Sequence, residues 1–379
     1  MPLTARGLNR ATLARQGLLR REPMSVVEAV RRVTALQAQE PASPYLALWN
    51  RVEGFDPADL DRAFADQTVV KATLMRVTLH AVAAEDYPAL HEAMQVTLRG
   101  ARLYDQRFRR TGLTLDDAGA LMPEVLEHLR SPRSNAEAEA WLDERIGQTP
   151  RPGVWWAMRQ YGPFIHVPTG GPWGFGSRPA YIGAPAALRE SRPTEIAAAA
   201  VLVRRYLEAF GPATAQDIAQ FGMLYAGVVR GGIEGLGDEL VTLDGPGRTP
   251  WYDVSGAPLP DAATAAPPRL LPMWDSILLA YRDRSRIIPE AYRRLVIQGN
   301  GDALPTLLVD GYVAGVWRPL EHGIEATAFH PLADDVWAGL DAEARALRAF
   351  LAHREPLVYG RYARWWQGLK GAAVRIIGS

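Results

Sequence analysis

The chain has 379 residues, enough for two or three domains, and its 42 basic residues balance its 42 acidic residues. This balance excludes a uniformly basic nucleic-acid coat and an acidic disordered tail, so any site for a polyanion must be local. The sequence contains no cysteine, which excludes disulfides, thiolate nucleophiles, zinc fingers and iron–sulfur clusters.

The sequence contains neither a stretch typical of a membrane-spanning helix nor a segment typical of a secretion signal. The longest strongly apolar stretch, residues 196–203, is far shorter than the roughly 20 residues that span a membrane. Residues 1–21 are polar and contain arginines, unlike a secretion signal. We therefore expect a cytoplasmic protein that does not bind a membrane.

Residues 1–110 predict three helices followed by two strands. The helices are expected over residues 8–19, 25–39 and 57–67. Alternating β-branched residues over 70–85 suit a pair of strands.

Residues 111–190 repeat this order of elements. One helix begins near Asp116, a second is capped by Ser134, and a third has Pro152 near its first turn. Residues 164–177 then read as a strand, a glycine-rich turn and another strand.

Residues 191–258 repeat the order a third time. A helix capped by Thr194 ends at Gly211, a short helix opens at Thr214, and a third helical stretch starts at Met223. Residues 239–254 read as two strands around a Gly/Pro turn. Helix, short helix, helix and hairpin is the winged-helix plan. The sequence therefore predicts three tandem winged helices, over 1–110, 111–190 and 191–258.

Residues 259–379 have a different composition. After a Pro/Ala-rich linker over 258–268, apolar and polar residues alternate over 295–319 around two glycine-containing turns. A long helix is expected over 334–353. We predict an α+β fold, in which three winged helices are followed by a C-terminal domain of antiparallel strands.

Most familiar catalytic motifs are absent from the sequence. It contains no Walker loop, no dinucleotide-binding GxGxxG, no GxSxG and no HExxH. The seven histidines show no ligand spacing, so we expect neither a metal nor a cofactor. The acidic pairs at 116–117 and 334–335 begin helices, which they stabilise.

Gln37 and Gln39 are the candidate catalytic residues. On a continuous helix, residues two apart point in different directions and could not serve one site. Pro41 disfavours helix at Glu40. If the chain leaves the helix before the glutamines, their amides can converge; otherwise they are solvated residues at a helix end.

Basic residues gather in several net-positive stretches of the chain. Within residues 281–294, Arg282, Arg284 and Arg286 form a basic stretch that could bind a polyanion or be a solvated basic loop. The turn over 298–302 could probe a groove of the DNA, or be an ordinary surface hairpin.

The sequence resembles the winged-helix DNA glycosylases of the AlkZ and YcaQ family over essentially its whole length. The resemblance lies in LQAQ at 36–39, TLMRVTLH at 73–80, YLEAFGPATAQDIAQF at 206–221, LLPMWDSILLAYRDRSRI at 270–287 and LLVDGYVAGVWRP at 307–319. Val77 stands where many relatives have glycine. The resemblance implies a C shape around DNA, with Arg282, Arg284 and Arg286 of the motif at 270–287 bound to DNA phosphates. Arg76 and His80 of the motif at 73–80, and Lys71 just before it, are also expected to contact DNA.

The resemblance implies a monofunctional glycosylase that hydrolyses the N-glycosidic bond of N7-alkylated guanine. It also implies unhooking of interstrand crosslinks of the azinomycin B type, which would give self-resistance. Only Lys71 offers an amine near the glutamines, so we expect an abasic product with the strand intact. The expected partner is damaged double-stranded DNA, bound by a monomer in an open concave site.

Two other classes of function remain open at this stage. A winged-helix transcriptional regulator would bind DNA without catalysis. A resistance protein could instead sequester the toxin on its tryptophans, of which the sequence has 11.

Overall fold

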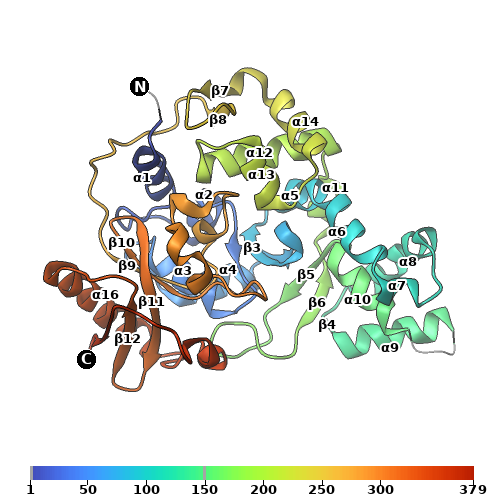
Figure 1. Ribbon diagram of the computed structural model, residues 1–379. Helices are drawn as coiled ribbons and strands as arrows, with labels where there is room; N and C mark the ends of the chain where they lie inside the picture. Colours follow the sequence, from blue (N-terminus) through green and yellow to red (C-terminus); the bar gives the residue numbers. More distant parts are fainter. Residues whose placement is uncertain (1–2, 148–150) are drawn as a thin grey trace.

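The computed structural model describes residues 3–147 and 151–379 (Figure 1). The first repeat contains α1 (Ala5–Arg15), α2 (Val26–Arg32), β1 (Leu36–Gln37), α3 (Ala42–Trp49), α4 (Pro57–Ala65), β2 (Val69–Thr73) and β3 (Leu79–Ala83). Helices α5 (Tyr87–Ala93), α6 (Gln95–Leu103) and α7 (Gln106–Arg109) follow. The sequence did not predict α3, because all eight of its residues are buried and it lacks a polar face.

The second repeat projects from the right of the molecule in Figure 1. It contains α8 (Leu115–His128), β4 (Arg133–Ser134), α9 (Asn135–Ile146), α10 (Pro152–Tyr161), β5 (Phe164–Val167), β6 (Ala180–Gly183) and α11 (Ala186–Glu190). Thr114 and Ser134 form the capping boxes that start α8 and α9.

The strand expected near residues 173–177 is wrong. This segment is a loop, and Gly170, Gly171 and Gly174 there have positive φ. Trp173 and Phe175 are buried and pack against Tyr45 and Phe64 of the first repeat. Burial of these aromatic rings fixes the loop without strand pairing.

The first two repeats share one six-stranded antiparallel sheet, with the order β1-β3-β2-β5-β6-β4. Lys71 of β2 pairs with His166 of β5 at the junction. The predicted limit at residue 110 therefore does not separate two sheets. The junction also covers the edges of β2 and β5, which would otherwise be unpaired.

The third repeat forms the upper part of the molecule (Figure 1). It contains α12 (Glu195–Phe210), α13 (Ala215–Gly222), α14 (Ala226–Leu236), β7 (Leu240–Leu243) and β8 (Trp251–Val254). The predicted caps at Thr194 and Thr214 are confirmed. Ala213 bridges to Tyr252, so each repeat has the order helix, short strand or bridge, helix, helix, hairpin. The number of winged-helix modules and a C shape around DNA stay predictions.

The C-terminal part is built on a five-stranded antiparallel sheet with the order β13-β12-β11-β10-β9. Its strands are β9 (Arg269–Leu271), β10 (Thr306–Val309), β11 (Tyr312–Leu320), β12 (Gly323–Ala328) and β13 (Ala373–Ile377), and α16 (Asp334–Ala352) is the predicted long helix. Residues before 298 do not form the expected strand, because α15 (Arg293–Val296) is a single helical turn.

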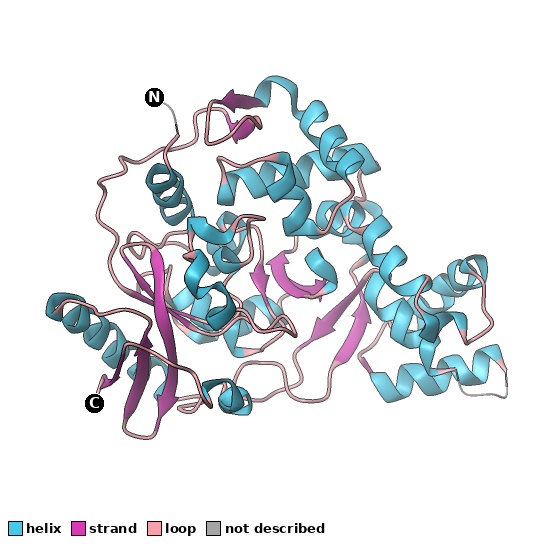
Figure 2. Cartoon of the chain, in the orientation of Figure 1, coloured by secondary structure: helices cyan, strands magenta, loops and turns pink. Residues whose placement is uncertain are grey.

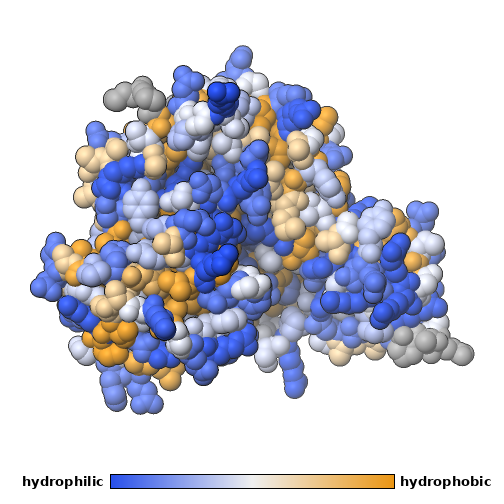
Figure 3. Space-filling model, in the orientation of Figure 1, coloured by the Kyte–Doolittle hydropathy of each residue, from blue (hydrophilic) through white to orange (hydrophobic). Residues whose placement is uncertain are grey.

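The α+β class is confirmed, since helices and antiparallel sheets both form large parts of the chain (Figure 2). One hydrophobic core cluster runs from the first repeat to the C-terminal part. Polar residues cover most of the face in Figure 3, where a recess separates the main body from the projecting second repeat. No helix among residues 3–147 and 151–379 is long and apolar enough to cross a membrane.

Candidate functional site

Gln37 and Gln39 lie where the first repeat changes from helix to strand. Helix α2 ends at Arg32, and Thr34 has a left-handed φ of 68°, so the chain leaves the helix before both glutamines. The side-chain carbonyl of Gln37 accepts the backbone N–H of Gln39 at 2.8 Å. Gln37 is 5% exposed, whereas Gln39 is exposed. The helix predicted over 25–39 is therefore wrong in its last seven residues, because the left-handed turn at Thr34 ends it early. Gln37 fixes the backbone that presents Gln39.

Gln39 lines a cavity of about 510 Å³ between the first two repeats. The described residues that line the cavity provide amides, hydroxyls, cations and aromatic rings, but no carboxylate: Gln39, Pro41, Lys71, Thr73, Val77, Thr78, Leu79, Arg102, Asn135, Arg159, Gln160, His166, Thr169, Phe175, Gly176, Ser177, Pro179, Tyr181 and Arg361. Gln37 is not among them. The cavity thus combines a neutral amide with positive charge, which suits a phosphate-bearing ligand.

Lys71 lies at the sheet junction, on the wall of this cavity. It is 4% exposed, and its ammonium group lies 4.1 Å from the centroid of the Phe175 ring. Burial lowers the pKa of this amine to about 8, although the charge of Glu40 opposes the shift. Lys71 is therefore an unusually acidic ammonium group beside the candidate catalytic amide.

Glu40 follows the glutamines directly, and the sequence analysis did not consider it for catalysis. Its carboxylate accepts hydrogen bonds from Arg361 and from the hydroxyl of Tyr362. Burial raises the pKa of Glu40, which these two donors partly offset. The position of Glu40 next to Gln39 was the one sequence signal that could have identified it. Its contact with Arg361 joins residues far apart in the chain, so a local sequence pattern does not predict it.

Arg76 and His80 contact each other through their side chains. Arg76 donates to the carbonyl of Phe221 at 2.8 Å, and its guanidinium lies 3.2 Å from His80 Nε2. Burial and the Arg76 charge lower the pKa of His80 to about 3, so the imidazole is neutral at pH 7. Its Nδ1 lies 3.0 Å from the carbonyl of Thr78, which fits a proton on Nδ1 and acceptance from Arg76 by Nε2. Both side chains are thus engaged within the protein.

The three arginines predicted in one basic stretch have different surroundings. Arg282 is exposed and contacts Gln216, and Arg284 is half-buried near the charges of Arg76 and Arg293. Arg286 is 7% exposed, and it donates to the carbonyls of Phe210 and Pro212 at 3.2 and 2.9 Å. Arg282 and Arg284 therefore reach the surface, while Arg286 joins the C-terminal part to the third repeat.

A second group of arginines surrounds Trp156 on α10. The guanidinium groups of Arg102 and Arg107 lie 4.9 and 4.5 Å from the centroid of the Trp156 ring. Arg107, Arg151 and Arg159 line a cavity of about 630 Å³ there, and Arg159 also lines the Gln39 cavity. None of these arginines was among the residues predicted from the sequence to bind DNA, because the contacts with Trp156 join residues far apart in the chain.

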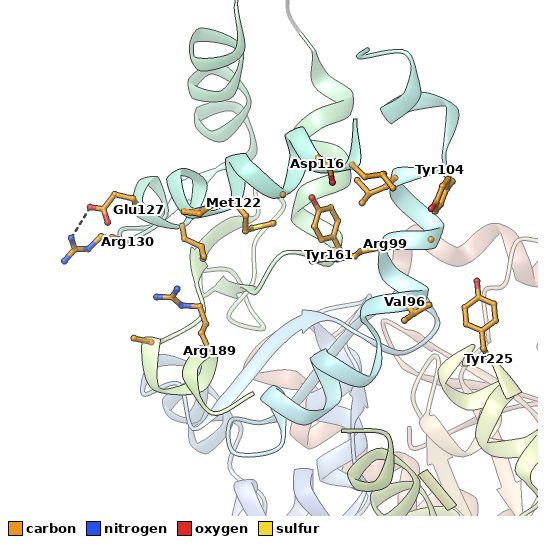
Figure 4. Close-up of a pocket in the computed structure, with 17 residues that line it drawn as sticks. Val96, Arg99, Tyr104, Asp116, Met122, Glu127, Arg130, Tyr161, Arg189 and Tyr225 are labelled. Carbon is orange, nitrogen blue, oxygen red and sulfur yellow. Dashed lines mark hydrogen bonds and ion pairs between the residues drawn. The ribbon is translucent and has the colours of Figure 1, made fainter. Parts of the chain in front are cut away.

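A larger cavity of about 1410 Å³ lies between α6, α8 and α11 (Figure 4). Tyr104 and Tyr225 are exposed at its edge, and Arg99 extends from α6 into the same region. None of the residues predicted to act in catalysis or DNA binding lines it. Among residues 3–147 and 151–379, no three His, Cys, Asp or Glu side chains are grouped as metal ligands would be.

Comparisons with known proteins agree with one another. A curated relative from Streptomyces sahachiroi, named interstrand DNA cross-link repair glycosylase, is 26% identical over 348 residues, covering 84% of this chain and 88% of the relative. The solved structure of Streptomyces sahachiroi DNA glycosylase AlkZ has the same fold, with a TM-score of 0.80 at 22% identity over 94% of this chain and 99% of that chain. The AlkZ-like DNA glycosylase family matches residues 30–350, and the chain belongs to this family.

Proposed function

We propose that this protein is a monofunctional DNA glycosylase for N7-alkylated guanine, including guanines in interstrand crosslinks. The observation that carries the proposal is the position of Gln39, a neutral amide in a cavity whose described lining contains no carboxylate. The relative's name, interstrand DNA cross-link repair glycosylase, supports the crosslinked substrate. By the same likeness we propose that the protein gives resistance to an agent of the azinomycin B type.

The lack of a carboxylate fits a substrate that is already activated. Alkylation at N7 gives guanine a positive charge, so the base leaves without a strong general acid. The enzyme must then stabilise an oxocarbenium-like sugar and orient a water molecule. The Gln39 carbonyl can accept a hydrogen bond from that water and direct its dipole to the developing cation. An amide does this less strongly than a carboxylate, so we expect normal guanine to be left intact.

The cations in the cavity have a separate role in this proposal. Lys71 and Arg159 would repel a cationic base but attract the phosphates that flank it. Arg282 and Arg284 would hold phosphates farther along the duplex. The protein would act as a monomer in the cytoplasm, without a cofactor, and leave an abasic site in an intact strand.

Base release from duplex DNA containing N7-methylguanine tests the proposal. We expect Gln39→Ala to lower single-turnover release by about 10²-fold, since loss of one oriented dipole has this order of effect. Gln37→Ala should also slow release, because it frees the backbone that presents Gln39. Gln367→Ala, at an exposed glutamine outside the cavity, is the matched control and should release base at the wild-type rate.

Two results would contradict the proposal. One is equal release by wild type and Gln39→Ala at matched DNA affinity. The other is no release by wild type together with tight binding to one DNA sequence, which would indicate a transcriptional regulator.

A further inference from the structure

Lys71 combines three features that its place in a sheet does not require. Its side chain lines the same cavity as Gln39. The Lys71 side chain is 4% exposed, and its ammonium group lies over the Phe175 ring without a hydrogen bond or ion pair to any described residue. A cation in this position loses hydration without gaining a carboxylate partner, which is costly for packing alone.

We propose that Lys71 condenses reversibly with the abasic sugar left by base release, and so holds this product in the cavity. The proposal rests on the glycosylase function, because it assigns a second step to the same site. The ligand class is an aldehyde: the ring-opened form of a deoxyribose that has lost its base.

The chemistry of this step is balanced without a further reactant. The deprotonated amine of Lys71 attacks the C1′ aldehyde carbon, the carbonyl oxygen leaves as water, and a Lys71–C1′ imine remains. Addition of water reverses the reaction and returns the free amine and the aldehyde. The low pKa of Lys71, about 8, leaves roughly one molecule in ten with a free amine at pH 7.

The same cavity accounts for a strand that stays intact. Cleavage by β-elimination requires a base to remove a proton from C2′, and no carboxylate is among the described residues that line the cavity. His166 does line it, but burial and the Lys71 charge hold the pKa of its imidazole well below its ordinary value. Glu40 is held by Arg361 and Tyr362. We expect the imine to hydrolyse faster than it eliminates, so that the DNA backbone stays intact.

Reductive trapping tests the proposal on the full-length protein. A labelled duplex with one abasic site, prepared by removal of uracil, is incubated with the protein and sodium cyanoborohydride and run on a denaturing gel. Hydride from the reagent converts an imine to a stable secondary amine, which appears as a protein–DNA adduct. We expect an adduct with wild type, and at least about tenfold less with Lys71→Arg, which keeps the charge but removes the nucleophile.

The composition of the chain provides an unusually clean control. Lys370, the one other lysine in the sequence, is exposed, and Lys370→Arg should form as much adduct as wild type. Peptide mapping of the wild-type adduct by mass spectrometry must place the DNA on Lys71, and this readout does not depend on the folding of a variant. Absence of adduct from wild type, or mapping to Lys370 or the terminal amine, would overturn the proposal.

The trapping experiment is independent of glycosylase activity, because the abasic site is supplied. Adduct formation without base release from alkylated DNA would retain the role of Lys71 and contradict the proposed function. Base release without any adduct would retain the proposed function and contradict the role of Lys71.

Discussion

Val77 has a left-handed backbone with a φ of 56°, directly after Arg76 with a φ of 54°. These residues form the turn between β2 and β3, closed by a 3.1 Å bond from the N–H of Thr78 to the carbonyl of Met75. Two central residues with positive φ resemble a type I′ turn, which favours glycine and disfavours β-branched residues. A glycine would fit this geometry, and Val77 instead carries strain at the wall of the Gln39 cavity.

This strain predicts an order of stability for two substitutions. Val77→Gly should have a free energy of unfolding about 1 kcal/mol higher than Val77→Ala, because alanine keeps the Cβ that the left-handed region disfavours. Both variants remove the same apolar side chain apart from one methyl group, so the comparison isolates the backbone. Chemical denaturation followed by tryptophan fluorescence measures the difference, and a more stable alanine variant would refute a left-handed Val77.

At the level of elements, the sequence predicted those helices that carry a local signal, such as a capping residue at the first turn. Helices α9, α12 and α13 begin directly after the predicted caps at Ser134, Thr194 and Thr214. Helix α3 has no such signal, and its place after Gln39 depends on burial from all sides. The pairing of β2 with β5 joins residues far apart in the chain, so local pattern could not predict it. The candidate site was therefore half predicted: Gln39 and Lys71 came from sequence, whereas His166 and Phe175 required the sheet junction and the aromatic loop.

Two buried ion pairs connect the first repeat to other parts of the chain. Arg15 of α1 contacts Asp253 of β8, and Arg51, after α3, makes two 2.8 Å hydrogen bonds to Asp275. The side chains of Arg51 and Asp275 are 2% and 0% exposed. Such a pair is weak evidence of net stabilisation, but removing one partner leaves a buried charge uncompensated.

Asp275→Asn should therefore destabilise the protein by about 3–5 kcal/mol, although it changes only one atom type. The exposed pair of Arg130 and Glu127 provides the control, since Glu127→Gln makes the same chemical change in solvent. Glu127→Gln should change the free energy of unfolding by no more than about 1 kcal/mol. Equilibrium denaturation of both variants checks the prediction, which fails if the two substitutions cost the same.

At the scale of the whole molecule, net neutrality hides a strongly local distribution of charge. Acidic residues are numerous on α8 and α9, whereas arginines gather around Trp156 and around Arg284. Arg15 and Arg51 are each neutralised by a buried carboxylate. We therefore expect DNA affinity to come from arginines whose guanidinium groups lack such a partner.

Arg284 is the sharpest test of this reasoning, because it lies near Arg76 and Arg293 and its charge is not matched by a carboxylate in its surroundings. Each phosphate contact adds about −0.9 to the slope of log K against log salt concentration, so Arg284→Ala should make this slope less negative by about 1. Binding should weaken similarly for every undamaged sequence, since a phosphate contact carries no sequence information. Arg345→Ala removes the same charge from α16, where Arg345 is paired with Asp341, and should leave the slope unchanged. Fluorescence anisotropy with a short duplex at several salt concentrations gives both slopes. Equal slopes for Arg284→Ala and wild type would place the DNA on another surface, of which the arginines around Trp156 are the next to examine.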